Sequence, residues 1–530
     1  MRIFFCLRFL IMILILLSVN IAFTQEYPDE INETRQLESF AEKRDADPDD
    51  DSYEMNLESR KRHPLDLNKA SADELYELQV LTALQIADFI QYKKLLGKLL
   101  SIYELQAIPG WDLTTIRELL PYIIVGKDES LYSAVRERWK GGDASLLVRE
   151  SQVLEKSAGY TRPANPESSY YKGSPQGIYF RYIYNYKQLL QYGMSGEKDA
   201  GEQFFRGAQR YGFDFYSFHF FLRNAGIIKN LALGDFTVNF GQGLIQWQTI
   251  ASAKGGNVMG IKRQAAPLRS YHSAGEFNFH RGVGINLQKG KWSGTLFLSY
   301  QKISSNPDTD TLGRDDIFTS FENSGYHRTA NEIADRGNNN QFSAGGNLVY
   351  SVSRFNAGVN FTHFRFAKSF QKKEEPYNLY SFRGRHLSDI SFDYGYTLGN
   401  IHFFGELASD QANHRAFVQG ALLSLGNELD LSVLYRNISP AYQSLYSDAF
   451  TENSSPVNEK GFYSGLSFRP VDGLKVEMYY DLFVFPWLKY RIDAPGSGND
   501  FLFQAFFQPT KNWYLGTVYK QEKKAGNQDI

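Results

Sequence analysis

The stretch ISFDYGYTLGNIHFFGEL, residues 390–407, has apolar side chains at every second position. Its first arm carries Ile390, Phe392, Tyr394 and Tyr396 at the apolar positions. Gly399-Asn400 then offers a tight turn, and the alternation resumes at Ile401. A period of two places successive side chains on opposite faces of a strand. The stretch therefore predicts a β-hairpin with one apolar and one polar face.

The same alternation recurs through most of the chain, in arms at 283–288, 296–300, 355–362, 429–435 and 474–480. Between the arms, short connections are expected at 289–291, 351–354, 399–400, 426–427, 469–473 and 509–511. Longer ones alternate with them, at 302–340, 367–386, 409–415, 437–459 and 484–499. Strict alternation of tight turns and long loops is typical of bacterial outer-membrane barrels. A soluble β-sandwich, the alternative, has no reason to place every long loop at one end.

The fold class expected is mainly β: a transmembrane antiparallel β-barrel of about 16–18 strands, preceded by a small all-α domain. Further strands are expected near 144–154, 176–186, 188–197, 212–222 and 230–241, for a total of about seventeen. Single-chain bacterial barrels have even strand numbers. Two explanations stay open: a strand overlooked within 127–143 or 242–280, or a barrel (127–530) that is C-terminally incomplete and has a seam between its first and last strands.

The N-terminus resembles an export signal. Arg2 and Arg8 accompany an apolar run over 9–18, and Ala22-Phe23-Thr24 places small residues at a cleavage-site spacing. Residues 1–24 are therefore expected to be a signal peptide; a membrane anchor is the alternative. Residues 25–62 are polar and acidic, which predicts a disordered linker. The single cysteine, Cys6, lies in the signal, so no thiol chemistry is expected in the mature chain.

Residues 63–126 have helical periodicity in two copies. Ser71 and Glu74 form a capping-box pattern, and apolar residues follow at helical spacing. The segments LDLNKASADELYEL and IPGWDLTTIRELLPYI resemble the tandem helix-hairpin-helix module of DNA-binding competence proteins. Joined to a barrel, the module resembles that of uncharacterised bacterial outer-membrane β-barrel proteins with such an N-terminal region.

The hairpin turns depart from that family. It uses Gly-hydrophobic-Gly, because bare backbone N–H groups must approach a phosphate closely. The first turn here is Val80-Leu81-Thr82, and the second, Gly110-Trp111-Asp112, places an acid where the phosphate would sit. A degenerate module that docks a protein or plugs the barrel is therefore expected, and nucleic acid is a disfavoured partner. The residues expected to contact DNA or another partner are Lys93, Lys94, Lys98, Gly110 and Trp111.

The segment ALGDFTVNFGQGLIQW (232–247) and the basic loop after it are the most unusual part of the barrel. Glycines at 241, 243, 255, 256 and 260 would let this loop bend inward. The residues expected to line a positive constriction are Lys254, Lys262, Arg263, Arg269, His272 and Arg281. An ordinary cell-surface loop is the alternative.

Other function classes have little support. The formal net charge is −2, and no phosphate-binding glycine loop, nucleophile elbow or metal-binding pair is present. The expectation is a non-catalytic outer-membrane channel or envelope assembly component that needs no cofactor or metal. Its expected partners are outer-membrane lipid and a periplasmic or outer-membrane protein, with the helical module in the periplasm. A DNA-uptake protein is the alternative.

Overall fold

The structure is a computed structural model that describes residues 60–527 apart from 79, 127–137, 163–168, 188, 250, 252–253, 309–316, 427, 472 and 511–512. The predicted signal peptide, most of the predicted linker and residues 127–137 of the predicted barrel lie outside the described residues.

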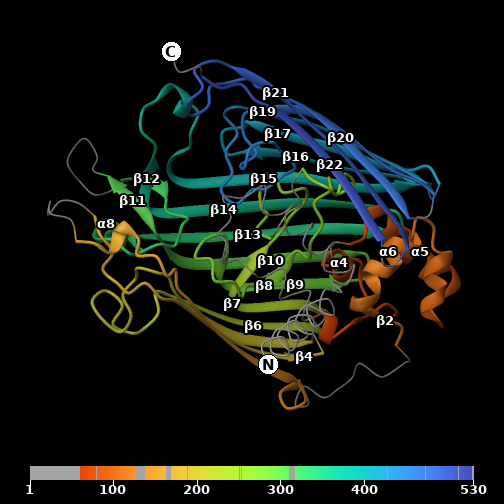
Figure 1. Cartoon of the computed structure of the whole chain (residues 1–530), viewed down its shortest axis with the longest axis horizontal. Helices are drawn as coiled ribbons and strands as arrows, with labels where there is room; N and C mark the ends of the chain where they lie inside the picture. Colours follow the sequence, from red (N-terminus) through yellow and green to blue (C-terminus); the bar gives the residue numbers. More distant parts are fainter. Residues whose placement is uncertain are drawn as a thin grey trace, which may run out of the picture.

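A single antiparallel sheet rolled into a barrel makes up most of the described chain (Figure 1). Its long strands are β3 (Asp143–Ser151), β4 (Gly177–Tyr186), β5 (Leu190–Lys198), β6 (Phe215–Ala225), β7 (Ile228–Val238), β9 (His280–Lys289), β10 (Trp292–Ile303), β13 (Asn339–Val352), β14 (Phe355–Gln371), β15 (Arg383–Leu398), β16 (Ile401–Asp410), β17 (Arg415–Ser424), β18 (Leu429–Ile438), β19 (Glu459–Val471), β20 (Leu474–Phe485), β21 (Gly496–Thr510) and β22 (Trp513–Lys523). Strands such as β10, β14, β15 and β20 show the two-residue period read from the sequence, and the expected fold class is confirmed.

Several short strands and helices lie in the connections between the long strands. The region 302–340, expected to be a long loop, contains β11 (Ser305–Asp308), β12 (Ile317–Phe321) and α8 (Ala330–Asp335), so that part of the prediction is wrong. The two strands form because β11 pairs with β12. Two residues of β12 also pair with β14. Within 242–280 the described strand is β8 (Leu268–Ser270), too short to cross the barrel. Two single turns, η3 (Ala158–Tyr160) and η4 (Pro376–Asn378), lie in other loops.

The barrel has its polar side chains inside and its apolar side chains outside. On β10, Leu296 and Leu298 point outward and are exposed, whereas Thr295 and Ser299 on either side of them and Phe297 between them are buried. β20 repeats the arrangement, with Leu482 exposed beside a buried aspartate. The register pairs like with like, because Leu296 and Leu298 face residues of β9 and β13 on the same surface. The outer surface is therefore the apolar face of the sheet.

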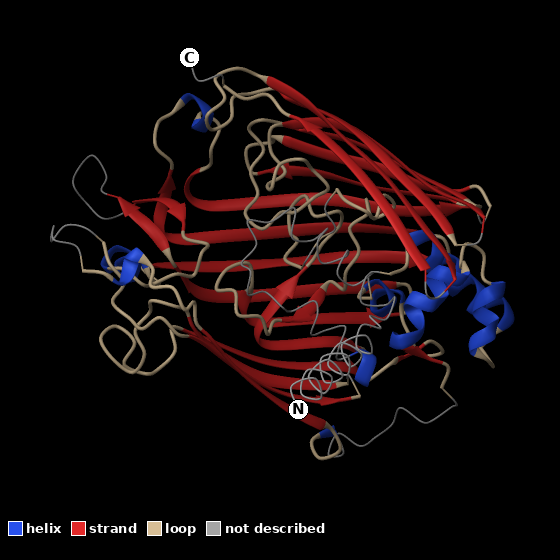
Figure 2. Cartoon of the chain, in the orientation of Figure 1, coloured by secondary structure: helices blue, strands red, loops and turns tan. Residues whose placement is uncertain are grey.

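The two ends of the barrel differ. Two-residue connections join β6 to β7, β9 to β10, β13 to β14, β15 to β16, β19 to β20 and β21 to β22 at one end. The long connections gather at the other end, together with α8, β11 and β12 (Figure 1). The helices of the N-terminal module lie against the short-turn end (Figure 2).

The strand order places β22 next to β3, but among the described residues no ladder of paired residues joins these two strands. The sheet has twenty strands among the described residues, and without β8, β11 and β12 seventeen long strands remain. Sixteen antiparallel ladders lead from β3 round to β22, so these two strands run in the same direction. Side chains on β22 are exposed along its whole length, and those on β3 nearly so. The number of long strands is therefore odd, as counted from the sequence, and the expectation of incompleteness stays a prediction.

The module has its own apolar core. It consists of α4 (Ala72–Tyr76), α5 (Ala83–Leu96), η1 (Ile102–Ala107), α6 (Leu113–Leu119) and η2 (Leu120–Tyr122), tied at the ends by the parallel pair β1 (Leu65–Asp66) and β2 (Ile123–Ile124). Its buried residues include Leu75, Leu78, Leu81, Ile86, Phe89, Leu105, Ile108, Ile116 and Leu119. These were expected from the helical spacing, although Ile90 and Leu120 of the same pattern are exposed.

One boundary needs correction. Residues 60–62, assigned above to the disordered linker, are helical, and Arg60 is held by an ion pair with Glu77 of the module. Among the described residues, no helix is both long and apolar enough to cross a membrane.

Candidate functional site

The described residues of the loop between β7 and β8 (239–249, 251 and 254–267), called the lumen loop below, lie inside the barrel. It begins with a turn at Gly241, whose φ of +56° is in the left-handed region. A Cβ at this glycine would lie 2.7 Å from the carboxylate carbon of Glu406 on β16. That carboxylate accepts the backbone N–H groups of Gln242 at 2.7 Å and Leu244 at 3.0 Å. The backbone of the loop is thereby fastened to the barrel wall.

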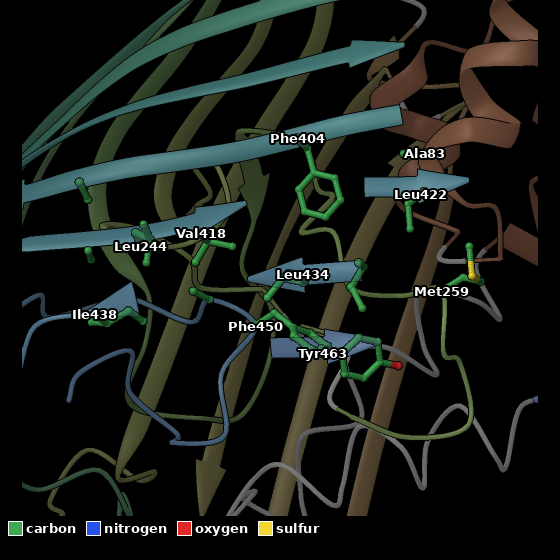
Figure 3. Close-up of a cluster of buried hydrophobic side chains, with 14 of the residues drawn as sticks. Ala83, Leu244, Met259, Phe404, Val418, Leu422, Leu434, Ile438, Phe450 and Tyr463 are labelled. Carbon is green, nitrogen blue, oxygen red and sulfur yellow. The ribbon is translucent and has the colours of Figure 1, made fainter. Parts of the chain in front are cut away.

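An apolar cluster packs the loop against the wall (Figure 3). The loop contributes Leu244, Ile245, Val258, Met259 and Ile261. Strands β16 to β21 contribute Phe404, Val418, Leu422, Leu434, Tyr463, Tyr479 and Leu502, and α5 contributes Ala83. Burial of such side chains stabilises by about 1.5–3 kcal/mol each. The barrel interior therefore has a packed core that joins the loop, the wall and the module.

A second loop, residues 439–458 between β18 and β19, also turns inward and contacts the first. Tyr442 donates its hydroxyl to the carbonyl of Leu244 at 2.9 Å, and the backbone N–H of Trp247 donates to Tyr446 at 2.6 Å. Burial holds the pKa of the Tyr442 hydroxyl well above its usual value, so this donor stays protonated. The two loops therefore form one hydrogen-bonded plug.

The expected positive constriction is neutralised by ion pairs. Lys254 pairs with Glu452 and Asp481, and the guanidinium of Arg263 lies 3.3 Å from Asp448. Arg281, on β9, makes a two-pronged contact with Asp235 at 2.7 and 2.8 Å.

The remaining candidates differ in their partners and in their charge. Arg269, on β8, has its Nε 3.9 Å from Glu77. Burial lowers the pKa of Lys262 to about 8, and its Nζ lies 2.9 Å from a ring nitrogen of His402. His272 is buried, which holds its pKa well below the usual value and keeps it neutral. The structure thus brings most of these residues into the barrel interior, and their role in selecting ions stays a prediction.

The module is attached to the barrel by a buried carboxylate. Glu77 lies 2.6 Å from Arg60 of the module, 3.5 Å from Arg223 at the end of β6, and 3.9 Å from Arg269. Burial raises the pKa of this carboxyl, but Arg223, Arg269 and Arg60 together outweigh burial and lower it to about 2. Glu77 is therefore ionised and is shared between module and barrel.

Two more contacts fasten the module to the short turns. Asp112 lies 3.1 Å from the Nε of Arg469 near the β19–β20 turn. Arg354, in the β13–β14 turn, donates to the side chain of Gln91 at 2.6 and 3.0 Å. A small cavity of about 40 Å³ remains between module and plug, lined by Tyr76, Thr82, Trp247, Met259 and Lys262 among others. Such a volume accommodates water rather than a solute.

The hairpin turns expected to approach DNA face the barrel instead. Thr82 caps α5, and Asp112 caps α6 by accepting the N–H of Thr115 at 2.6 Å. Trp111 is buried against Phe89, with its ring centroid 5.5 Å away. Gly110 accepts a hydrogen bond from Gln85 at 2.7 Å.

Of the three expected lysines, Lys93 donates to the carbonyls of Leu67, Asn68 and Ala70. It therefore joins the first segment of the module to α5. Lys94 and Lys98 are exposed. The structure thus places only two of the five expected contact residues at the free surface of the described module.

Sequence reasoning missed the residues that hold the assembly together, namely Glu77, Arg223, Glu406 and Arg469. Glu406 lies at an inward-facing position of the alternation that starts at Ile401, where a polar residue is expected. The sequence pattern therefore does not distinguish it from other polar residues of the strand. Glu77 follows the capping box of α4 with no pattern of its own. Glu77 and Arg223 are 146 residues apart in the sequence, and Glu406 is 164 residues from Gln242, so local spacing held no signal for these contacts.

No family model and no curated protein matches this chain. Among solved structures, OpdQ of Pseudomonas aeruginosa is similar over 66% of this chain and 87% of its own, with 12% identity and a TM-score of 0.35. Wzi of Escherichia coli, an outer-membrane carbohydrate-binding β-barrel involved in group 1 capsule assembly, is similar over 72% and 80%, with 9% identity and a TM-score of 0.33. An anion-selective porin of Comamonas acidovorans is similar over 66% and 85%, with 13% identity and a TM-score of 0.26. At these values the likeness assigns neither a solute nor a partner to this chain.

Proposed function

We propose that this protein is a non-catalytic outer-membrane β-barrel for transport or envelope assembly, closed at rest by its own loop and by the helical module. An outer-membrane location is supported by the distribution of side chains on the barrel, with polar side chains inside and apolar side chains outside. The exposed apolar strand positions would face lipid hydrocarbon. The short-turn end would face the periplasm, which places the helical module there. The observation that carries the proposal is the three-point attachment of the module to that end through Glu77, Gln91 and Asp112.

The closed state supports a regulated passage rather than an open pore. A general porin keeps a polar, water-filled lumen. Here the lumen loop carries an apolar core, and its Lys254 and Arg263 are ion-paired. Passage of a solute would require the plug, the module or both to move. A periplasmic or outer-membrane protein that binds the module would supply the energy for that movement.

The proposal is tested by tethering the module to the barrel. Cysteines at Gln91 and Arg354, joined by a cleavable bis-maleimide, would bridge a contact between module and rim. The natural Cys6 lies within the predicted signal, so Cys6→Ser keeps the tether specific. In planar bilayers, moderate urea should open channels in the untethered protein and not in the tethered one. Cleavage of the tether should restore the openings.

The matched control is the single variant Gln91→Cys treated with the same reagent. It should behave like the untethered protein. Equal conductance with and without the tether would contradict a plug role for the module. A large conductance without urea would contradict a barrel closed at rest.

A further inference from the structure

Four acidic or imidazole side chains converge at the long-loop end of the barrel. Glu202 comes from the β5–β6 loop, Asp214 lies just before β6, and Glu276 precedes β9. His327 lies between β12 and α8. The ligand-type atoms of Glu202, Asp214 and His327 all lie within 4.8 Å of one another, and the three residues are buried. The Nδ1 of His327 is 2.5 Å from Asp214 and 3.9 Å from Glu276.

The charges in this cluster are poorly balanced. The Nε of Arg336 lies 3.2 Å from Asp214, but its side chain is 34% exposed, so solvent screens part of its charge. This contact is made to the buried Oδ1 of Asp214, whereas Oδ2 faces His327. The carboxylates of Glu202 and Glu276 add two further acidic groups around the His327 ring, with Glu276 3.9 Å from its Nδ1. Buried carboxylates in such numbers require either protons or a cation.

The histidine is oriented as a metal ligand is. Its Nδ1 faces the carboxylates, and its Nε2 lies 3.3 Å from the hydroxyl of Ser304. A ligating imidazole usually gives its other N–H to a fixed acceptor, which holds the ring in place. One imidazole nitrogen with two or three carboxylates suits zinc and its first-row neighbours better than calcium or magnesium, which prefer oxygen alone.

We propose that Glu202, Asp214, His327 and Glu276 bind a divalent transition-metal ion of the zinc class. The ion would cross-link the loops that begin at β5, β8 and β12 and so stiffen the long-loop end of the barrel. The proposal is independent of the plug, because none of these residues touches the module or the lumen loop in the contacts described above.

A Ser304–His327–Asp214 hydrogen-bonded series also resembles the arrangement of a serine hydrolase. Two observations favour the metal. The hydroxyl of Ser304 already accepts the N–H of Gly337 at 3.1 Å, and His327 is only 1% exposed, which leaves no path for an ester to reach the imidazole. The additional carboxylates of Glu202 and Glu276 also have no part in such a triad.

The test uses the full chain purified in detergent, stripped with a chelator and dialysed against Zn²⁺ or Co²⁺. Wild-type protein should retain one ion per chain, and bound Co²⁺ should show a visible absorption band stronger than that of the aqueous ion. Glu202→Gln and His327→Gln should each weaken binding at least about tenfold, the scale on which a site's supporting groups act. His414→Gln is the matched control, because His414 pairs with Asp410 at 2.9 Å at the same end.

Metal content equal in wild type and in Glu202→Gln would overturn the proposal. Covalent labelling of Ser304 by a fluorophosphonate would overturn it in favour of a hydrolase. If the variants fail to assemble, the wild-type Co²⁺ spectrum decides: absence of a bound ion after dialysis would also overturn the proposal.

Discussion

At the scale of single residues, Glu77 is the most consequential side chain of the module. Three arginines surround it, and two of these belong to the barrel. Removing one member of a buried ion pair costs up to about 3–5 kcal/mol, because the partners stay buried without compensation. We expect Glu77→Gln to release the module, measured as faster cleavage of residues 60–126 by trypsin in the otherwise folded barrel. Glu104→Gln, within the module and away from the rim, should leave cleavage unchanged.

Glu77 also predicts that the attachment of the module to the barrel depends on pH. The pKa of Glu77 falls from 4.5 to about 2 on folding. A lowered carboxyl pKa contributes stability above the unfolded value, which is lost as the pH falls through the folded value. Attachment of the module should therefore weaken between about pH 4.5 and pH 2. Glu77→Gln should remove that part of the pH dependence, and an unchanged profile would show that other carboxyls carry it.

Asp112 tests the DNA alternative. Its carboxylate caps α6 and binds Arg469, so the turn that would receive a phosphate is used inside the protein. The full chain in detergent should bind duplex DNA no more tightly than the non-specific range of about 10⁻⁴ M at physiological salt. Asp112→Gly should not create tight binding, because the turn still faces the barrel. A submicromolar, salt-sensitive Kd for the unaltered protein would favour DNA uptake.

At the scale of elements, the turn at the start of the lumen loop depends on glycine. Gly241 and Gly290 have φ values of +56° and +61°, but only Gly241 has a neighbour, Glu406, where a methyl group would lie. Alanine in the left-handed region costs about 1–2 kcal/mol at either position. Gly241→Ala should lower the urea midpoint of unfolding clearly more than Gly290→Ala, because it also displaces the carboxylate that anchors the loop. Equal midpoints would show that the anchor contributes little.

The outward face of the strands carries a further prediction. Leu298, at the middle of β10, is 53% exposed although it is apolar. An arginine facing the middle of a bilayer costs about 2–4 kcal/mol. Leu298→Arg should therefore reduce assembly into membranes, measured by the yield of heat-modifiable protein. Leu154→Arg, in a connecting segment outside the strands, is the control and should assemble normally.

At the scale of the whole molecule, the apolar outer face and polar inner face of the barrel predict where the protein resides. Its exposed apolar strand positions require lipid, and its buried polar ones require an interior that water or polar groups can reach. In cell fractionation, the mature chain should sediment with the outer membrane and change its gel mobility on heating. Recovery in the soluble fraction after osmotic shock would rule out the membrane barrel.

Much of the fold followed from local pattern alone. Alternation over 390–407 predicted a hairpin that the structure contains as β15 and β16, since every strand residue must face one of two sides. The helical spacing of Leu75, Leu78 and Phe89 predicted the module core for the same kind of reason. The glycines of the loop after β7 left two possibilities open, an inward bend and an ordinary cell-surface loop, and the contacts with Glu406 place the loop inside the barrel.

What the tertiary structure alone decided is which distant residues meet. Local spacing indicates the face on which a side chain lies, but not the partner that the folded barrel brings opposite it. Arg469 meets Asp112 across the rim, and Glu202 meets His327 across the mouth, because the sheet curves back on itself. Such contacts depend on where the ends of the strands lie in space. The sequence by itself therefore determined the barrel and the existence of the module, whereas only the folded chain determined that the barrel is filled, where the module attaches and which loops share a cluster of charge.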